Sequence, residues 1–114
     1  MKYRLMHRAQ HSSRDYLELI PNEAWSVDYI SHKLDNGHRS RSITIIDVCT
    51  RERLATKSGV SLHAEQFIEV LEELCRVRGA PQLLMCDRSA EFSRRIFLTW
   101  ASHHRVQIVY GSSR

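Results

Sequence analysis

The stretch PNEAWSVDYI, residues 21–30, decides the fold prediction, because its apolar, strand-like second half carries a carboxylate, Asp28. A second apolar run, LLMC at residues 83–86, ends on Asp87. An ionised carboxylate among apolar side chains costs several kcal/mol unless it is paired or binds a metal. We therefore take Asp28 and Asp87 as candidate metal ligands. Metal-assisted phosphodiester chemistry is the use that such a pair suggests.

Three strands are predicted in succession around Asp28. They span residues 25–34, 42–48 and 54–60. The sequence DNG at residues 35–37 tolerates positive backbone φ and predicts a hairpin turn between the first two. Polar residues alternate along the third strand, which suits the edge of a sheet.

A change of hydrophobic period then predicts a helix. Apolar residues recur at helical spacing over residues 64–78, with Ser61 expected as the N-cap and Gly79 and Pro81 expected to end the helix. Residues 82–86 form a short apolar run, as expected for a buried parallel strand.

A second helix and a fifth strand complete the predicted elements. Ser93 is expected to cap the helix, and residues 106–110 are expected to form the strand. The helix is expected to bury one apolar face made of Ile96, Phe97, Trp100 and Ala101.

The order β-β-β-α-β-α-β predicts an α/β fold, a mixed five-stranded sheet with helices against it. In such a sheet the strands that carry Asp28 and Asp87 can lie side by side. Two adjacent carboxylates stay ionised together only with a cation between them, and oxygen ligands suit Mg²⁺ or Mn²⁺. From spacing alone, the alternative of two satisfied structural acids stays open.

Composition places the chain among globular proteins of the cytoplasm. The 114 residues are 42% apolar, which predicts one domain with a real core. Neither a membrane-spanning run nor a secretory signal is evident in the sequence. Its cysteines, Cys49, Cys75 and Cys86, lack paired spacing and are predicted to be small buried residues in a reducing compartment, and no zinc site is expected.

The net charge of +4 permits a polyanionic partner without requiring one. Residues 1–20 are predicted to be a basic lead-in that carries Lys2, Arg4, Arg8 and Arg14. One interpretation is a solvated tail, and the other is a linker that touches a phosphate backbone.

The sequence around the two acids resembles bacterial insertion-sequence transposases, whose catalytic core is similar to retroviral integrase. In that family a Pro-Asn-x-x-Trp-x-x-Asp stretch delivers the first catalytic Asp, and here it matches residues 21–28 and therefore Asp28. CDRSAEF, residues 86–92, stands where the family has Asp-Asn-Gly-Pro-Glu-Phe, so Asp87 matches the second catalytic Asp.

Two further segments carry the same resemblance. IDVCTRE at residues 46–52 resembles the family's hairpin segment, and RGAP at residues 78–81 resembles the turn before its fourth strand. The match runs in order from Pro21 to Tyr110, which makes it more specific than any one motif. It implies an RNase H-like three-layer fold that lacks its final helices, with residues 21–114 as a partial integrase catalytic core domain.

The sequence also departs from the family pattern. Arg88, Ser89 and Ala90 replace its Asn, Gly and Pro, and the cation of Arg88 is expected to oppose metal binding beside Asp87. Relatives continue into a helix that bears a catalytic Glu, whereas this sequence stops at Arg114. The final helices and the N-terminal DNA-binding region of relatives are therefore expected to be absent.

Other acids are interpreted as structural. Glu91 is expected at the positive end of the second helix rather than as the third catalytic acid, and Asp47 is expected to be a turn residue. Three glutamates of the first helix are expected to form a solvated face, namely Glu69, Glu72 and Glu73.

The resemblance implies cleavage and transfer of DNA phosphodiester bonds by two Mg²⁺ (or Mn²⁺) ions. Asp28 would bridge the metals and Asp87 would hold one of them. With two acids of three, the isolated chain is expected to be nearly inactive. The alternative is a non-catalytic remnant that binds DNA or associates with itself, and an RNA-directed nuclease of the same fold is a weaker third hypothesis.

DNA is the partner that the resemblance implies, and no membrane is expected. A homodimer or higher self-association is expected as well, because loss of the last helix would leave Val106 and Ile108 short of cover and the fifth strand with an open edge.

Overall fold

The strand and helix patterns are realised in the predicted order. The structure is a computed structural model, and it describes residues 19–60, 62–87 and 95–110. Its elements are β1 (Ala24–Lys33), β2 (Arg39–Asp47), β3 (Arg53–Gly59), α1 (Ala64–Arg78), β4 (Leu83–Cys86), α2 (Arg95–His103) and β5 (Gln107–Tyr110).

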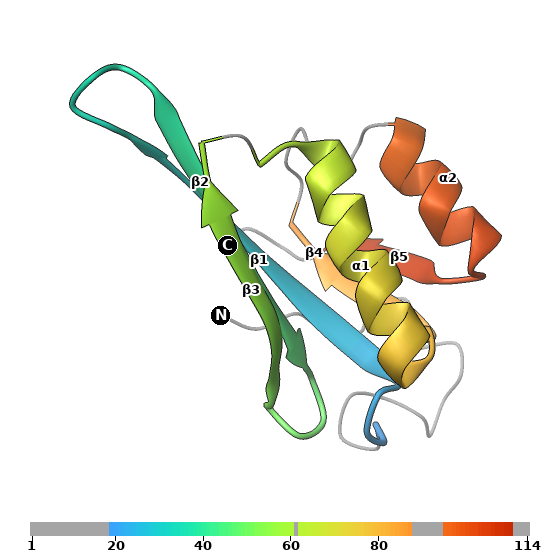
Figure 1. Ribbon diagram of the computed structural model, residues 1–114. Helices are drawn as coiled ribbons and strands as arrows, with labels where there is room; N and C mark the ends of the chain where they lie inside the picture. The colour runs from blue at the N-terminus through green and yellow to red at the C-terminus, as the bar shows by residue number, and fades with distance from the viewer. Residues whose placement is uncertain (1–18, 61, 88–94, 111–114) are drawn as a thin grey trace.

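One mixed sheet joins the five strands in the order β3-β2-β1-β4-β5 (Figure 1). The β1–β2 and β2–β3 pairs are antiparallel, whereas β4 is parallel to both β1 and β5. The strands β1 and β4, which lead to the two candidate acids, are therefore direct neighbours, as the sequence predicts. β3 forms one edge of the sheet, also as predicted, and β5 forms the other.

The hairpin between β1 and β2 closes at the predicted turn. The backbone N–H of Leu34 donates to the carbonyl of His38 at 2.7 Å, and the N–H of Gly37 donates to the carbonyl of Leu34 at 2.9 Å. Gly37 has a φ of 90°, a value that glycine adopts without steric cost. The distal end of this hairpin projects beyond the rest of the molecule (Figure 1).

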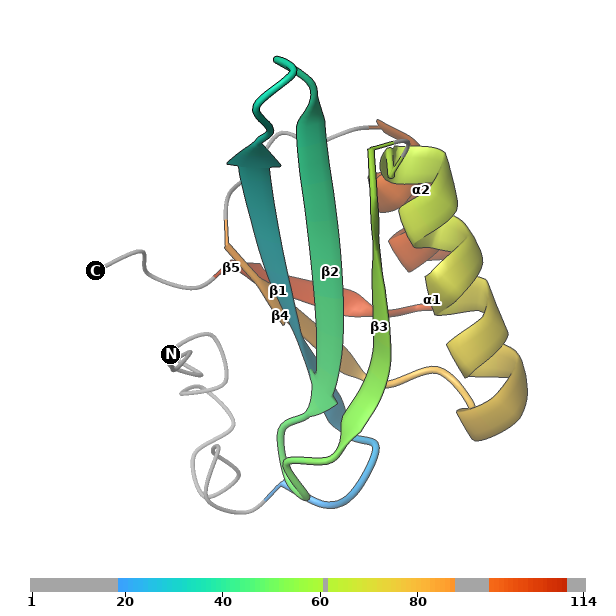
Figure 2. The ribbon, with the colours of Figure 1, turned by 60° about the vertical axis from the view of Figure 1, so that its left-hand side comes forward.

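Both helices pack on one face of the sheet, as Figure 2 shows. Sheet residues such as Trp25, Val27 and Leu84 form a core there with helix residues such as Phe67 and Phe97, whose rings stack with centroids 5.4 Å apart. The opposite face carries a smaller buried cluster made of Leu19, Ala24, Leu83, Met85 and Val109.

Three local details differ from the sequence predictions. α1 has His63 as its N-cap, with the backbone N–H of His63 donating to Gln66 Oε1 at 2.9 Å, in place of Ser61, which lies outside the described residues. β2 begins three residues early, at Arg39, because the hairpin pairing continues to Lys33. Ile96 is 38% exposed, so the buried face of α2 consists of Phe97, Trp100 and Ala101 alone.

The expectation of uncovered residues near the fifth strand is wrong for Val106. Its side chain is 6% exposed and belongs to the core under the helices, and Ile108 packs against the same core. Ser93 lies outside the described residues, so its capping role stays a prediction. Among the residues that the structure describes, no helix combines the length and apolar character that a membrane-spanning segment requires.

Candidate functional site

Asn22 lies at the entry to β1 and bonds to three separate parts of the fold. Its backbone N–H donates to Asp47 Oδ2 at 2.7 Å, and its side-chain Oδ1 accepts from Trp25 Nε1 at 2.8 Å. Its Nδ2 donates to the carbonyls of Arg78 and Gly79, at 3.0 and 3.1 Å, where α1 ends. Its φ of 67° is a conformation that Asn tolerates better than most residues. Asn22 thus ties β1 to the end of β2 and to the end of α1.

Asp47 is the second member of this corner and is 1% exposed. Besides the bond from Asn22, its Oδ1 accepts from the backbone N–H groups of Cys49 and Thr50, at 2.8 and 3.1 Å. Its interpretation as a turn residue is therefore confirmed. The burial of its carboxylate is offset by these donors, since an anion bonded to several backbone N–H groups is stable without a metal.

The side chains of Asn22, Trp25 and Asp47, together with the end of α1 at Arg78 and Gly79, form what we call the clasp. It unites three of the four segments that carry the family resemblance. Beside it, the carbonyl of Glu23 accepts from the N–H groups of Gln82 and Leu83, at 2.9 and 3.1 Å. The clasp and these bonds lie where β1 and β4 begin, so they fix how the two strands are aligned.

This alignment places the candidate acids together. β1 and β4 pair in parallel with Trp25 opposite Leu84 and Ser26 opposite Met85. Continued by two residues, the same register sets Asp28 opposite Asp87. Because side chains alternate along a strand, Asp28 shares its face with Ala24, and Asp87 shares that same face with Leu83 and Met85. Both acids therefore belong to the face of the sheet that α1 and α2 leave free.

The two carboxylates differ in environment. Asp28 is exposed, whereas Asp87 directly follows β4 and has one oxygen, Oδ1, that is buried without a hydrogen-bond partner among the described residues. Burial raises the pKa of the neighbouring Cys86 thiol to about 12, and the negative charge of Asp87 is the second, smaller cause of this increase. An unbonded buried carboxylate oxygen is rare in folded proteins and calls for a ligand such as a cation.

No third acid completes the pair in the described part of the chain, where no group of three or more His, Cys, Asp or Glu is placed to hold a metal ion. Residues 88–91, with the substitutions beside Asp87 and with Glu91, lie outside the described residues, and so do Lys2, Arg4, Arg8 and Arg14.

The glutamates on the acidic face of α1 are exposed as predicted, but two of them also contact basic side chains. Glu72 Oε2 lies 3.0 Å from His104 Nε2, which joins α1 to the end of α2, and Glu73 pairs with Arg76. A hollow of about 540 Å³ lies between Glu72 and His104 and their neighbours. This interhelical contact was not predicted, because residues 32 positions apart give no local signal.

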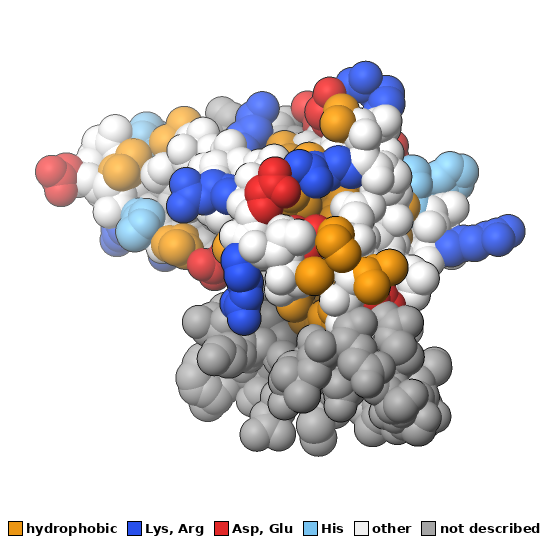
Figure 3. All heavy atoms as spheres, turned by 90° about the horizontal axis from the view of Figure 1, so that it is seen from below, with side chains coloured by type: hydrophobic (Ala, Val, Ile, Leu, Met, Phe, Trp, Pro, Cys, Tyr) orange, Lys and Arg blue, Asp and Glu red, His pale blue; other side chains and the backbone are white. Residues whose placement is uncertain are grey.

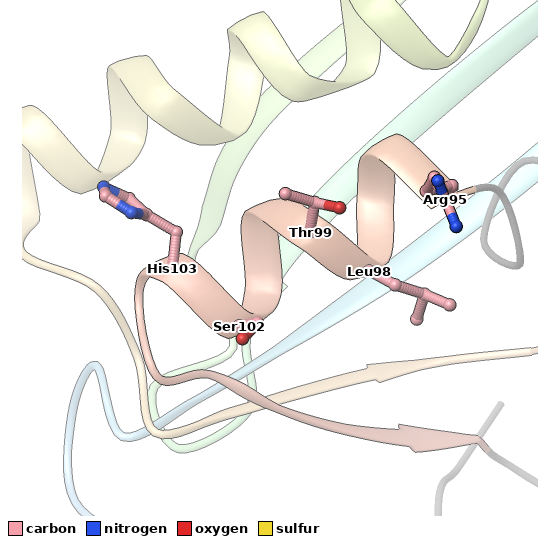
Figure 4. Close-up of a pocket in the computed structure, with 5 residues that line it drawn as sticks. All are labelled: Arg95, Leu98, Thr99, Ser102 and His103. Carbon is pink, nitrogen blue, oxygen red and sulfur yellow. The ribbon is translucent and has the colours of Figure 1, made fainter.

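A second hollow, of about 600 Å³, follows the outer side of α2 and is lined by Arg95, Leu98, Thr99, Ser102 and His103 (Figure 4). Neither hollow is lined by Asp28 or Asp87. The cysteines are all free thiols, and only Cys86 is fully buried; Cys49 is exposed, contrary to the prediction, because it belongs to the turn after β2.

Comparison with known proteins identifies the family. The model of the integrase core domain family matches residues 18–114, nearly the whole chain. The chain belongs to the integrase core domain family. An uncharacterized 31.7 kDa protein of insertion element IS407 from Burkholderia multivorans is 31% identical over 88 residues, which are 77% of this chain and 32% of that protein. An uncharacterized 39.2 kDa protein of insertion element IS476 from Xanthomonas euvesicatoria is 27% identical, over 77% of this chain and 25% of its own length.

The chain thus spans about a quarter to a third of the length of these insertion-element relatives. The resemblance to insertion-sequence transposases with an integrase-like core is confirmed by the family match and by both relatives.

Solved structures with the same fold are retroviral integrases. The HTLV-2 integrase catalytic core domain in complex with magnesium superposes with a TM-score of 0.67 at 14% identity, over 81% of this chain and 62% of that one. The simian T-cell lymphotropic virus intasome in complex with a PP2A regulatory subunit gives a TM-score of 0.69 at 16% identity, over 83% and 34%. These likenesses confirm the RNase H-like α/β fold.

Proposed function

We propose that this integrase core domain serves DNA transposition, as the part of a transposase that cleaves and joins phosphodiester bonds. The observation that carries the proposal is the common face and continued register of Asp28 and Asp87, with Asp87 Oδ1 buried and unbonded. A satisfied structural acid would look like Asp47, whose oxygens have three N–H donors.

The donor set suits Mg²⁺ or Mn²⁺. Both ions prefer oxygen ligands, and Mg²⁺ keeps several waters when a protein offers only one or two carboxylates. Asp28 and Asp87 would hold the ion, and the ion would polarise a phosphodiester and activate a nucleophile. The magnesium in the HTLV-2 integrase structure supports this choice by analogy.

We expect the isolated chain to bind Mg²⁺ weakly, because two carboxylates leave most of an octahedral ion to water and Arg88 follows Asp87 in sequence. Calorimetry is expected to give a Kd above about 0.1 mM, or some −5.5 kcal/mol. Arg88→Asn is expected to strengthen binding, while Arg105→Asn, a substitution of the same kind away from the acids, is the control. Tight binding by the unaltered chain would contradict this expectation.

A nicking assay separates the enzyme from a non-catalytic remnant that binds DNA or associates with itself. The 114-residue chain, Asp28→Asn and Asp87→Asn are incubated with supercoiled plasmid and Mg²⁺ or Mn²⁺. Slow nicking that needs the metal and disappears in both variants supports the enzyme. DNA binding in a gel shift without any such nicking favours the remnant.

Self-association of the chain is part of the proposal, with a homodimer as its simplest form. The HTLV-2 integrase core is found in a dimeric and in a trimeric form, which supports self-association by analogy. Exposed apolar side chains such as Val77 and Leu98, and the open edges of β3 and β5, provide surface for a second copy. Sedimentation at tens of micromolar is expected to show dimers, and a clean monomer would contradict this.

The roles of the N-terminal residues and of the remaining chain, and the location of the protein in the cell, are also part of the proposal. We propose residues 1–20 as a basic lead-in, with Lys2, Arg4, Arg8 and Arg14 as phosphate contacts, and residues 21–114 as the partial catalytic core. We also propose a cytoplasmic location, which fits a protein that acts on bacterial DNA.

A further inference from the structure

The projecting end of the β1–β2 hairpin, residues 30–42, is a two-stranded ribbon that we call the arm. Residues 30–39 are all exposed, and residues 40–42 are partly exposed. The arm extends away from the body of the molecule (Figure 1) and lies at the left of Figure 3, with Lys, Arg and His side chains along it. None of its residues belongs to either buried core cluster, so the core does not account for their identity.

The arm places two cations face to face. Lys33 of β1 lies directly opposite Arg39 of β2 in the antiparallel register, so both side chains project from the same face. Arg41 follows two positions along on that face. Like charges directly opposite one another destabilise a strand pair, and here nothing in the core requires them.

This repulsion is not relieved within the described chain. Arg39 Nη1 donates to the neutral hydroxyl of Ser31 at 3.1 Å, and neither Lys33 nor Arg39 forms an ion pair with a carboxylate in residues 19–60, 62–87 or 95–110. Asp35 is the only acid of the arm, and it lies in the turn. A destabilising pair of like charges that no neighbouring residue neutralises is expected where a protein contacts a partner.

We propose that the arm binds the phosphate backbone of duplex DNA, with Lys33 and Arg39 as its principal contacts. Phosphate oxygens are contacted mainly by Arg, Lys and hydroxyl side chains, and Ser31 lies on the same face of the arm as the cations, opposite Arg41. A two-stranded ribbon also has the dimensions that the major groove of B-DNA accepts. The inference rests on the proposed function only for the choice of DNA as the polyanion.

The arm's cations lie on the opposite face of β1 from Asp28, because residues 28 and 33 differ by an odd number of positions. DNA held by the arm is therefore positioned independently of the acid pair. This separation makes the two proposals testable apart from each other.

The test measures binding of the full chain to a fluorescein-labelled duplex of arbitrary sequence, by anisotropy at several salt concentrations without divalent metal. Lys33→Gln/Arg39→Gln is compared with Arg76→Gln/Arg105→Gln, which removes the same charge from an exposed site on α1 and an exposed site in the turn after α2. Each lost phosphate contact lowers the slope of log K against log salt by about 0.9, so the arm variant is expected to lose about 1.8 and the control none. Equal slopes for both variants would overturn the proposal.

Lys33→Glu provides a second test, because a purely structural role of Lys33 predicts a different result from a role in DNA binding. It places a carboxylate opposite Arg39, so the melting temperature is expected to stay unchanged or rise while DNA affinity falls. A lower melting temperature with unchanged affinity would assign Lys33 to the fold and overturn the proposal.

The same assay separates DNA binding by the arm from metal binding, because it contains no divalent metal and so does not depend on whether Asp28 and Asp87 hold a cation. Sedimentation separates it from self-association. If Lys33→Gln/Arg39→Gln keeps its DNA affinity but sediments as a smaller species, the arm instead contacts an acidic surface of a second copy, such as the glutamates of α1, and the proposal is wrong.

Discussion

The clasp and the acid pair both include residues of β1 or its entry, namely Asn22 and Trp25 in the clasp and Asp28 in the pair, yet their carboxylates have opposite environments. Asp47 in the clasp is buried with N–H donors on both oxygens. Asp87 has a buried oxygen with no partner among the described residues, and Asp28 is exposed. The clasp therefore satisfies its own carboxylate within the fold, whereas the acid pair does not, and this difference is why we propose the acid pair as a ligand site.

The two regions are also connected by geometry. Three segments that resemble the family meet in the clasp, where β1 and β4 begin, and the register set there carries Asp28 to a position opposite Asp87. The clasp residues, which have no proposed catalytic role, thus determine the register that brings Asp28 and Asp87 opposite each other.

The largest effect is expected for Asp47→Ala, which breaks the clasp. It leaves three part-buried N–H groups without their acceptor and a cavity in place of the carboxylate, so the free energy of unfolding is expected to fall by about 3 kcal/mol. Urea denaturation measures it. Asp28→Ala is the matched control, with an expected change within about 0.5 kcal/mol. Similar losses for the two variants would contradict the division of roles.

A smaller loss, about 2 kcal/mol, is expected for Asn22→Ala, because its side chain bonds Trp25 and the last carbonyls of α1. Asn36→Ala, in the exposed hairpin turn, removes one local bond and is expected to cost about 0.5 kcal/mol or less. Equal costs in the same denaturation assay would mean that the clasp does not hold β1 in place.

The smallest effect, and the opposite sign, is expected at the acid pair. Asp87→Asn replaces a charge whose buried oxygen has no donor, so without metal the free energy of unfolding is expected to stay constant or rise by up to about 1 kcal/mol. Asp47→Asn is the control, since it sets an amide against backbone N–H groups and is expected to destabilise. Destabilisation by Asp87→Asn as large as that by Asp47→Asn would assign Asp87 a structural role.

The sequence predicts the elements well where the signal is local. The bounds of α1 and the DNG turn follow from period and turn chemistry, and the structure confirms them. The parallel pairing of β1 with β4 is also predicted correctly, because a crossover helix separates two apolar runs.

What the sequence does not reveal depends on distant contacts. Asn22 forms hydrogen bonds with Arg78, 56 positions away, and with Asp47, 25 positions away, and no local sequence pattern predicts either contact. The opposition of Lys33 and Arg39 follows from the register of a hairpin that is longer than predicted. Cys49 and Ile96 are expected to be buried by residue type, but their place in a turn and on the outer side of a helix exposes them.

Paramagnetic broadening by Mn²⁺ tests most directly whether Asp28 and Asp87 form one cation site. Substoichiometric Mn²⁺ is added to the ¹⁵N-labelled chain, because this method detects weak binding and reports its location. We expect broadening of amide signals to be strongest around Asp28 and Asp87 together and weaker near Asp47 in the clasp, and we expect loss of the effect in Asp28→Asn and in Asp87→Asn. Broadening centred on the glutamates of α1, or unchanged in both variants, would contradict a shared cation site.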